Sequence, residues 1–255
     1  MSNLIQGPFC LMVMQGGLGN QLFQLLAGIE YARKYDKKLY LITASNRRPY
    51  YWDTVLSKYA DLVIDITRVP DDTYLHVEQK NSYQPLPLVP GNISFYGYFQ
   101  SMKYFPSITN ILELLDLKVT PLAENIVIVH ARRGDYLLHS DIHPVQSERY
   151  YSDAAAVMAS MVKDPYFILL SDETQYWTDH AATVFEGYGH AIWGDDNEVT
   201  TLAMMAGASN FIIANSTYSW WGAVLANAKN VIAPEKWYGD GRDASDLYLD
   251  HWIRL

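Results

Sequence analysis

Apolar runs of strand length alternate with longer segments of helical periodicity along most of the sequence. Residues 9–15 form the first apolar run, bounded by a proline and by glycines, which is typical of a fully buried strand. Residues 20–35 follow, with apolar side chains at helical spacing, and residues 38–43 form another strand-like run. The order strand, glycine turn, helix and strand indicates a βαβ unit. The helical face holds Leu22, Phe23, Leu26, Ala27 and Ile29.

The second half of the chain repeats this alternation more regularly. Its apolar runs predict strands, and the segments between them predict helices. Such repetition favours an open parallel sheet with helices on both faces. Strands are predicted over 125–131, 166–172, 190–194, 210–215 and 230–234, and helices over 147–163, 173–185, 198–208 and 216–229.

Residues 44–92 break the pattern, because they are rich in proline. We predict loops there and a single helix over 52–59. A strand is expected within 93–105, followed by a helix over 107–117. Since proline disfavours helix in the residue before it, a domain boundary is expected at Thr120–Pro121. The prolines lie at positions 49, 70, 85, 87 and 90.

These two halves predict an α/β fold with two Rossmann-like domains facing each other across a cleft. The N-terminal domain would cover residues 1–120 and the C-terminal domain residues 121–235, with a tail, 236–255, packing back on the fold. In open parallel sheets, ligands bind beyond the carboxyl ends of the strands. The residues that follow each strand are therefore the place to look for a site.

The composition fits a globular protein and narrows the classes of partner. Of the 255 residues, 49% are hydrophobic and 18% are charged, which excludes a disordered chain. The formal charge of −9 argues against nucleic acid and anionic membranes, because both require a basic surface. The 20 tyrosines and 7 tryptophans suit sugar stacking, but also ordinary half-buried packing.

Cysteine usage and hydropathy favour a cytoplasmic protein without a membrane span. Cys10 is the single cysteine, so no intrachain disulfide can form, and a small core residue is its simplest role. The sequence has no apolar run of about 18 residues and no basic leader. We expect a location in the cytoplasm or peripherally at the inner face of its membrane.

Glycines follow the first predicted strand. Gly16, Gly17 and Gly19 allow a tight turn, and the N–H groups that open the next helix favour an anion. The loop lacks the third glycine of a dinucleotide fingerprint, and no Gly-Lys-Ser/Thr follows it. A plain turn and an anion-binding loop both remain open.

Two arginines follow the strand 125–131. Arg132 and Arg133 are always charged, so each must meet a carboxylate or a bound anion such as phosphate. A charge pair about 4 Å apart contributes roughly 4 kcal/mol near a protein surface, against about 1 kcal/mol in water. The alternative to a bound anion is an ion pair within the protein, which for Arg133 would form with Asp135 or another carboxylate.

Polar residues also follow the strands 166–172 and 210–215. Ser216, Thr217 and Ser219 open a predicted helix, where they can cap it or help to hold a phosphate. Asp172 can accept a hydrogen bond from a ribose hydroxyl or a guanine edge, or cap the next helix. Trp220 and Trp221 are expected in the core, with an aromatic floor under a ligand as the alternative.

Metal chemistry has little support in the sequence. No two aspartates stand two apart, so the DxD pair that holds a metal ion in many nucleotide-sugar transferases is absent. His139 and His143 could share a helical face, but a zinc site needs further clustered ligands. We predict no metal site.

Five segments in this order resemble the α-1,2-fucosyltransferase family, especially its bacterial members. They are GGLGNQLFQ, GYFQSMKYF, HARRGDYL, FILLSDE and NSTYSWWGA, and the resemblance spans residues 11–237. It implies a GT-B-like fold, GDP-L-fucose as donor, no further cofactor or metal, and inversion at the fucose anomeric carbon. The acceptor implied is a terminal galactoside of a glycan.

The resemblance also implies roles for particular residues. Arg132 matches the arginine that holds the β-phosphate of the leaving GDP, and Asn20 matches a position beside the reacting hydroxyl. Asp135 is our first candidate for the base, followed by Asp141 and His143. The residues expected to contact the donor are Gly17, Gly19, His130, Arg132, Asp172, Ser216, Thr217 and Ser219.

Two other interpretations remain. One is a metal-independent nucleotide-sugar transferase that makes a different linkage, whether with fucose or another sugar. The other is a non-catalytic glycan-binding module, which the aromatic residues would suit but which leaves the paired arginines unexplained. Affinity for GDP distinguishes an enzyme from such a module.

Overall fold

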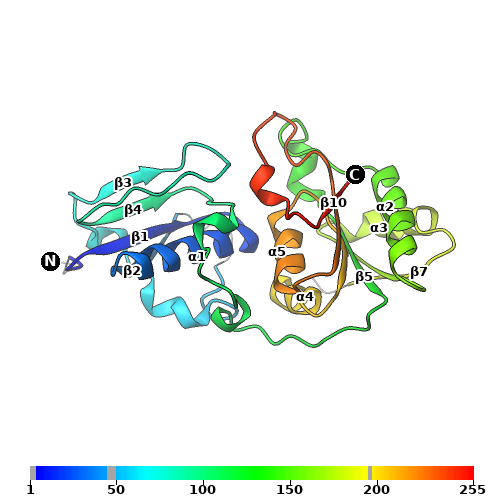
Figure 1. The fold of residues 1–255 in the computed structure, drawn as a ribbon, viewed down its shortest axis with the longest axis horizontal. Helices are drawn as coiled ribbons and strands as arrows, with labels where there is room; N and C mark the ends of the chain where they lie inside the picture. The colour runs from blue at the N-terminus through cyan, green and yellow to red at the C-terminus, as the bar shows by residue number, and fades with distance from the viewer. Residues whose placement is uncertain (1–3, 45–49, 195–196) are drawn as a thin grey trace. The chain divides into compact units, whose positions relative to one another are not determined.

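The computed structural model describes residues 4–44, 50–194 and 197–255, and the chain forms two compact units (Figure 1). Unit 1 contains residues Met1–Asp116 together with Ser245–Leu247. Unit 2 contains Leu117–Ala244 and Tyr248–Leu255. The units therefore divide between Asp116 and Leu117, and a short C-terminal segment belongs to unit 1.

Unit 1 is built on a four-stranded parallel sheet of order β2-β1-β4-β3. Helix α1, Leu18–Lys34, packs on one face of it. Gly28 of α1 makes the close approach possible, because a β-carbon there would lie 3.1 Å from Leu39 and 3.5 Å from Met12. The strands are β1 (Phe9–Met14), β2 (Lys38–Thr43), β3 (Tyr74–Val77) and β4 (Ile93–Tyr96).

Unit 2 is built on a six-stranded parallel sheet of order β10-β9-β8-β5-β6-β7. Figure 1 shows α2 and α3 on one side of this sheet and α4 and α5 on the other. The strands are β5 (Ile126–Ala131), β6 (Tyr166–Ser171), β7 (Gly189–Ile192), β8 (Asn210–Ile212), β9 (Asn230–Ala233) and β10 (Ile253–Arg254). The helices are α2 (Glu148–Met161), α3 (Thr174–Val184), α4 (Glu198–Met205) and α5 (Thr217–Leu225).

The predicted α/β class is confirmed, since each unit is built on a parallel sheet flanked by helices, as in Rossmann-like domains. The strands and helices predicted for the second half all occur, with ends shifted by a few residues. The short strands β3 and β10 were not predicted. Among the described residues, no helix is both long enough and apolar enough to cross a membrane.

Two predicted helices in unit 1 are wrong. Residues 52–59 contain turns and the start of a 3-10 helix, Ser57–Leu62, and residues 107–117 contain only the 3-10 helix Leu112–Leu114. The end of the second segment is bound by residues 58 and 59. The ammonium of Lys58 donates to the carbonyl of Glu113 at 2.8 Å, and the Tyr59 hydroxyl donates to that of Leu114 at 3.0 Å. Tertiary contacts thus hold this segment in its non-helical form.

Several chemically distinctive side chains belong to the core. Trp220 and Trp221 are fully buried, so packing is their role and they form no floor under a ligand. Cys10 is also buried, and burial raises the pKa of its thiol to about 12. It is therefore a small core residue and not a nucleophile.

Candidate active site

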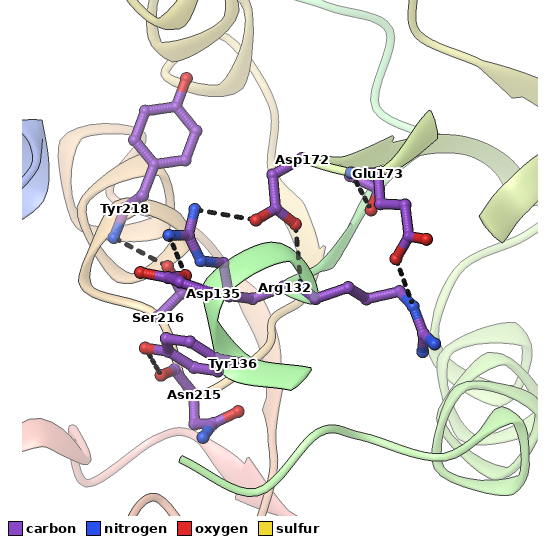
Figure 2. Close-up of polar contacts among 10 residues, drawn as sticks. Arg132, Asp135, Tyr136, Asp172, Glu173, Asn215, Ser216 and Tyr218 are labelled. Carbon is purple, nitrogen blue, oxygen red and sulfur yellow. Dashed lines mark hydrogen bonds and ion pairs between the residues drawn. The ribbon is translucent and has the colours of Figure 1, made fainter. Parts of the chain in front are cut away.

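Arg132 directly follows β5, and two carboxylates hold its guanidinium in place (Figure 2). Its Nη2 lies 2.6 Å from Oδ1 of Asp135, and its Nη1 lies 3.2 Å from Oδ2 of Asp172. Burial alone would lower the pKa of Arg132, but these carboxylates act more strongly and the net shift is upward. With 22% of its side chain exposed, Arg132 is a fixed positive charge that solvent or a ligand can reach.

Asp172 joins the ends of β5 and β6. Its Oδ2 pairs with Arg132, while its Oδ1 accepts the backbone N–H of Arg133 at 2.8 Å. Gly134 leaves the space for this carboxylate, because a β-carbon on Gly134 would overlap Oδ2 of Asp172. The predicted site residue Asp172 thus contacts Arg132 directly. Position 134 requires a glycine, because any larger residue would collide with Asp172.

Arg133 points to a different set of partners. Its Nε pairs with Oε2 of Glu173 at 3.1 Å, and its guanidinium lies 4.1 Å from the centre of the Tyr176 ring. The ion pair considered for Arg133 therefore forms with Glu173, whereas Asp135 pairs with Arg132. The two adjacent arginines have separate roles, and Arg133 ties the end of β5 to the start of α3.

The ring of Tyr136 also contacts the Arg132 guanidinium. The guanidinium of Arg132 lies 5.3 Å from the Tyr136 ring centre, and the His143 ring stacks on Tyr136 at 4.5 Å and 19°. The Tyr136 hydroxyl donates to the carbonyl of Asn215 at 3.0 Å, which connects this stack to the segment before α5 (Figure 2). Burial lowers the pKa of His143, so its imidazole is neutral at neutral pH. Asp141, the other candidate base, is exposed.

The start of α5 lies beyond the end of β8, the neighbour of β5 in the sheet. Ser216 caps the helix, and its Oγ accepts the backbone N–H of Tyr218 at 3.3 Å. Thr217 is the first residue of the helix and is partly exposed. Ser219 is fully buried, and its hydroxyl donates to the carbonyl of Ser216 at 3.2 Å. The hydroxyl of Ser219 is thus used inside the first turn of the helix.

His130, near the end of β5, is buried beside this helix start. It is 4% exposed, and its ring centre lies 5.8 Å from that of Tyr218. Burial lowers the pKa of His130 to about 3, and the charge of Arg132 adds to the effect. Among the described residues, Nδ1 of His130 has no hydrogen-bond partner. An unsatisfied buried polar group is unfavourable by about 1–3 kcal/mol, so a water molecule, an ion or a ligand is expected to complete it.

The glycine loop in unit 1 is only partly as predicted. Gly16 has φ +78°, in the left-handed region, and Gly17 caps α1 with extended backbone. Gly19 lies inside α1 and is buried, so it is not part of the loop. A β-carbon on Gly16 would lie 2.6 Å from Nδ2 of Asn20, and Oδ1 of Asn20 accepts a hydrogen bond from Nε2 of Gln100 at 2.9 Å.

Several residues around these groups were not predicted as site residues. Tyr136 lies within the segment HARRGDYL, but nothing in its spacing indicated a stack on Arg132. Gln100 is far from Asn20 in sequence and meets it only because β1 and β4 are neighbours.

As for metals, residues 4–44, 50–194 and 197–255 include no group of three or more His, Cys, Asp or Glu placed to hold an ion.

Solved structures of fucosyltransferases share this fold. POFUT1 in complex with GDP has a TM-score of 0.52 at 13% identity, covering 88% of this chain and 96% of that one. NodZ α-1,6-fucosyltransferase, co-crystallized with GDP, has a TM-score of 0.53 at 12% identity, covering 87% and 93%. A mutant of Arabidopsis thaliana FUT1 in complex with GDP has a TM-score of 0.54 at 12% identity, covering 92% and 73%. At these identities the likeness concerns the fold alone.

Two curated relatives come from Escherichia coli. The chain is 29% identical to an alpha-1,2-colitosyltransferase over 184 residues, which covers 65% of this chain and 63% of that protein's length. It is 26% identical to the O-antigen biosynthesis glycosyltransferase WbnK over 301 aligned positions, covering 95% of this chain and 99% of the relative. A family model, described as glycosyl transferase family 11, matches residues 78–255. Since that match covers well over half of the sequence, the chain belongs to glycosyl transferase family 11.

Proposed function

We propose that this protein transfers L-fucose from GDP-L-fucose to the 2-hydroxyl of a terminal galactoside, with inversion and without a metal ion. Unit 2 binds the donor and unit 1 the acceptor. The family membership supports glycosyl transfer, and the α-1,2 linkage in the name of one relative supports the linkage. The observation that carries the donor assignment is the fixed guanidinium of Arg132 beside a buried, unsatisfied His130 and the start of α5.

Arg132 is placed to stabilise the leaving diphosphate. As the sugar–phosphate bond breaks, negative charge develops on the β-phosphate and must be neutralised. A guanidinium has five N–H groups in a planar fork, and Asp135 and Asp172 each contact one of its terminal nitrogens. Because these carboxylates fix the guanidinium before the donor arrives, little reorganisation accompanies the reaction. One such donor contributes roughly 3–4 kcal/mol to a transition state.

The start of α5 and His130 would complete the donor site. The backbone N–H groups at the first turn of a helix attract an anion, and Ser216 and Thr217 add two hydroxyls there. His130 is neutral, so it would line the donor site without adding charge, and its buried Nδ1 would meet a nucleotide only after a covering side chain moved. Together these groups would bind the diphosphate and the nucleoside through different chemistry.

Inversion requires a group that removes the proton of the attacking hydroxyl. Asp135 is our first choice, because it lies beside Arg132 and its side chain is partly exposed. His143 is a second choice because it is neutral, although it stacks on Tyr136. Asn20 would then orient the acceptor hydroxyl by a hydrogen bond.

A colitosyl donor is a second candidate, favoured by the name of the first relative. Colitose is L-fucose without its 3-hydroxyl, so the same diphosphate site would serve both sugars. A site that forms hydrogen bonds with a substrate hydroxyl discriminates against the analogue without it by about 10⁴-fold. The ratio of the transfer rates with the two donors therefore distinguishes clearly between a fucosyl and a colitosyl site.

The test is a transfer assay with GDP-fucose or GDP-linked colitose as donor and a panel of β-galactosides as acceptors. We expect transfer from GDP-fucose, an α-1,2 linkage in the product by NMR, and full activity in EDTA. Transfer from the colitose donor alone would replace the donor assignment. Loss of activity in EDTA, restored by a divalent ion, would overturn the metal-free mechanism. Binding of glycan without binding of GDP would indicate a lectin-like module.

The same assay tests the base. If Asp135 removes the proton, Asp135→Asn lowers kcat and abolishes the acidic limb of the pH–rate profile. A variant with the height and shape of the wild-type profile would eliminate Asp135 and leave Asp141 and His143 as candidates.

A further inference from the structure

The turn that follows β4 in unit 1 is built around a partly buried carboxylate. Glu78, just after β3, accepts the backbone N–H of Tyr98 at 2.7 Å and that of Phe99 at 3.1 Å. Gly97 makes room for it, because a β-carbon there would overlap the Glu78 side chain. Phe99 is fully buried with φ +52°, a conformation that L-residues adopt only under constraint. Tertiary contacts therefore set the shape of residues 97–100.

Helix α1 fixes the same turn from the other side. Gln24 is completely buried, and its Nε2 donates to the carbonyl of Gly97 at 2.9 Å. Its Oε1 accepts the backbone N–H of Gln15 at 3.0 Å. One side chain thus binds both the loop after β1 and the turn after β4. These are neighbouring strands, so their carboxyl ends lie at the same edge of the sheet.

The result of this construction is the hydrogen bond between Gln100 and Asn20. Asn20 lies one helical turn before Gln24, on the same face of α1. Gln100 is 9% exposed, and its Nε2 donates to Oδ1 of Asn20 at 2.9 Å. The oxygen of the Asn20 amide is thereby directed to Gln100, and its nitrogen lies over Gly16. An amide can turn over with little steric change, so a fixed donor is what selects one orientation.

We propose that Gln100 is a positioning residue for Asn20, held in place by the turn that Glu78 and Gln24 build. The proposal rests on the proposed function, in which Asn20 orients the acceptor hydroxyl. Gln100 contacts no substrate in this proposal and acts through the amide of Asn20. An amide held in the wrong orientation would present an oxygen where the nitrogen belongs, and the acceptor would bind without being aligned for transfer.

A turn that required only stability would not need two buried amides, Gln24 and Gln100, and a partly buried carboxylate. Each buried amide or carboxylate is unfavourable unless it is hydrogen-bonded, whereas apolar side chains would fill the same space without that requirement. A buried polar network whose members are satisfied rigidifies its surroundings. Functional groups need such support, because a misplacement of about 1 Å can lower a rate by about 10²-fold.

A double-mutant cycle with Asn20→Ala, Gln100→Ala and the double variant tests the proposal. We expect Gln100→Ala to lower kcat for transfer by about tenfold to hundredfold, with the KM for the donor and the Kd for GDP unchanged. In the Asn20→Ala background, Gln100→Ala should cause no further loss. An equal loss in both backgrounds, or no loss in the wild-type background, would overturn the proposal.

Further variants separate this role from a loss of structure. Gln79→Ala removes an exposed glutamine of the same unit, whose amide donates to the carbonyl of Val77, and should leave kcat unchanged. If Gln100→Ala does not fold, Gln100→Glu replaces it in the cycle, since it keeps the volume and removes the N–H donor. A wild-type protein inactive with every donor would defeat the proposed function itself, whereas an active wild type with an additive cycle would defeat only the role of Gln100.

Discussion

The strand ends of the two units are held together by different chemistry. In unit 2, full charges connect the ends of β5 and β6, as Arg132 pairs with Asp172 and Arg133 with Glu173. In unit 1, neutral amides connect the ends of β1 and β4, as Gln100 donates to Asn20. Both sheets are parallel and both place their polar residues at the carboxyl ends of the strands. The common fold therefore determines where the polar groups lie, but not which kind they are.

The difference matches the two substrates of the proposed reaction. A diphosphate carries permanent charge and gains more during the reaction, so a guanidinium that cannot lose its proton suits it. An acceptor hydroxyl is neutral, and its position matters more than its charge, so a fixed amide suits it. The comparison predicts that changes in unit 2 affect donor binding and leaving-group stabilisation, while changes in unit 1 affect the alignment of the acceptor.

The largest effect is expected for Arg132→Ala. Transfer should fall by about a hundredfold to a thousandfold, because the charge on the leaving diphosphate loses its donor. The variant also leaves Asp135 and Asp172 without their shared cation, so GDP, which is an anion, should bind more weakly. Single-turnover transfer and calorimetric titration with GDP measure the two effects.

Arg149→Ala is the matched control. Arg149 belongs to the same unit, pairs with Asp153 on the surface of α2, and is 88% exposed. It should keep wild-type transfer and GDP affinity, since an exposed pair of this kind contributes little. Wild-type transfer by Arg132→Ala would show that the charged strand end of unit 2 is structural, and the contrast between the two units would lose its functional meaning.

The position of the site could be predicted from the sequence better than its contacts. Apolar runs identified the strands, so the residues after them, such as Arg132 and Asp172, could be named in advance. Which carboxylate meets which arginine depends on the register of β5 and β6, which a sequence does not specify. The pairing of Arg132 with both Asp135 and Asp172 is therefore information that only the structure provides.

The sequence pattern also failed to predict elements whose structure depends on contacts between distant residues. Residues 107–117 have a helical pattern, yet they form only the 3-10 helix Leu112–Leu114, whose end Lys58 and Tyr59 bind. The strand β3, YLHV, has only four residues, which is too short for its apolar side chains to reveal a strand. Glu78 lies in the proline-rich region, where polar residues are expected in loops, and Gln100 lies in the segment GYFQSMKYF, but nothing in the sequence indicated their partners. Their role depends on the pairing of β3 with β4 and of β4 with β1.

The two regions should also respond to acid in opposite directions. Burial lowers the pKa of His130 from 6.5 to about 3, so below pH 6.5 the unfolded chain binds a proton that the folded protein does not. Stability is therefore lost as the pH falls through this window. Burial raises the pKa of Glu78 above 4.5, so between 4.5 and the raised value the folded protein binds the extra proton. There stability is gained as the pH falls.

Urea unfolding between about pH 7 and about pH 4.5 measures both contributions. In the wild type, His130 should lower the free energy of unfolding by about 1.4 kcal/mol for each pH unit of acidification, and His130→Gln should lack this decrease. Glu78 should raise it in its own window, and Glu78→Gln should lack this increase. His251→Gln, which alters an exposed histidine, should keep the wild-type dependence. If His130→Gln keeps it as well, the buried neutral imidazole in unit 2 is contradicted.

The smallest effect expected is that of salt, and it bears on the comparison most directly. Raising the ionic strength from about 0.1 M to about 1 M shortens the Debye length from about 10 Å to about 3 Å, which weakens partly exposed charge interactions. The Kd for GDP should then rise by roughly threefold to tenfold, because Arg132 is partly exposed. The KM for a neutral galactoside should stay constant, since Asn20 and Gln100 carry no charge. An acceptor KM that rose in parallel with the Kd for GDP would mean that charge, and not a fixed amide, governs acceptor binding as well.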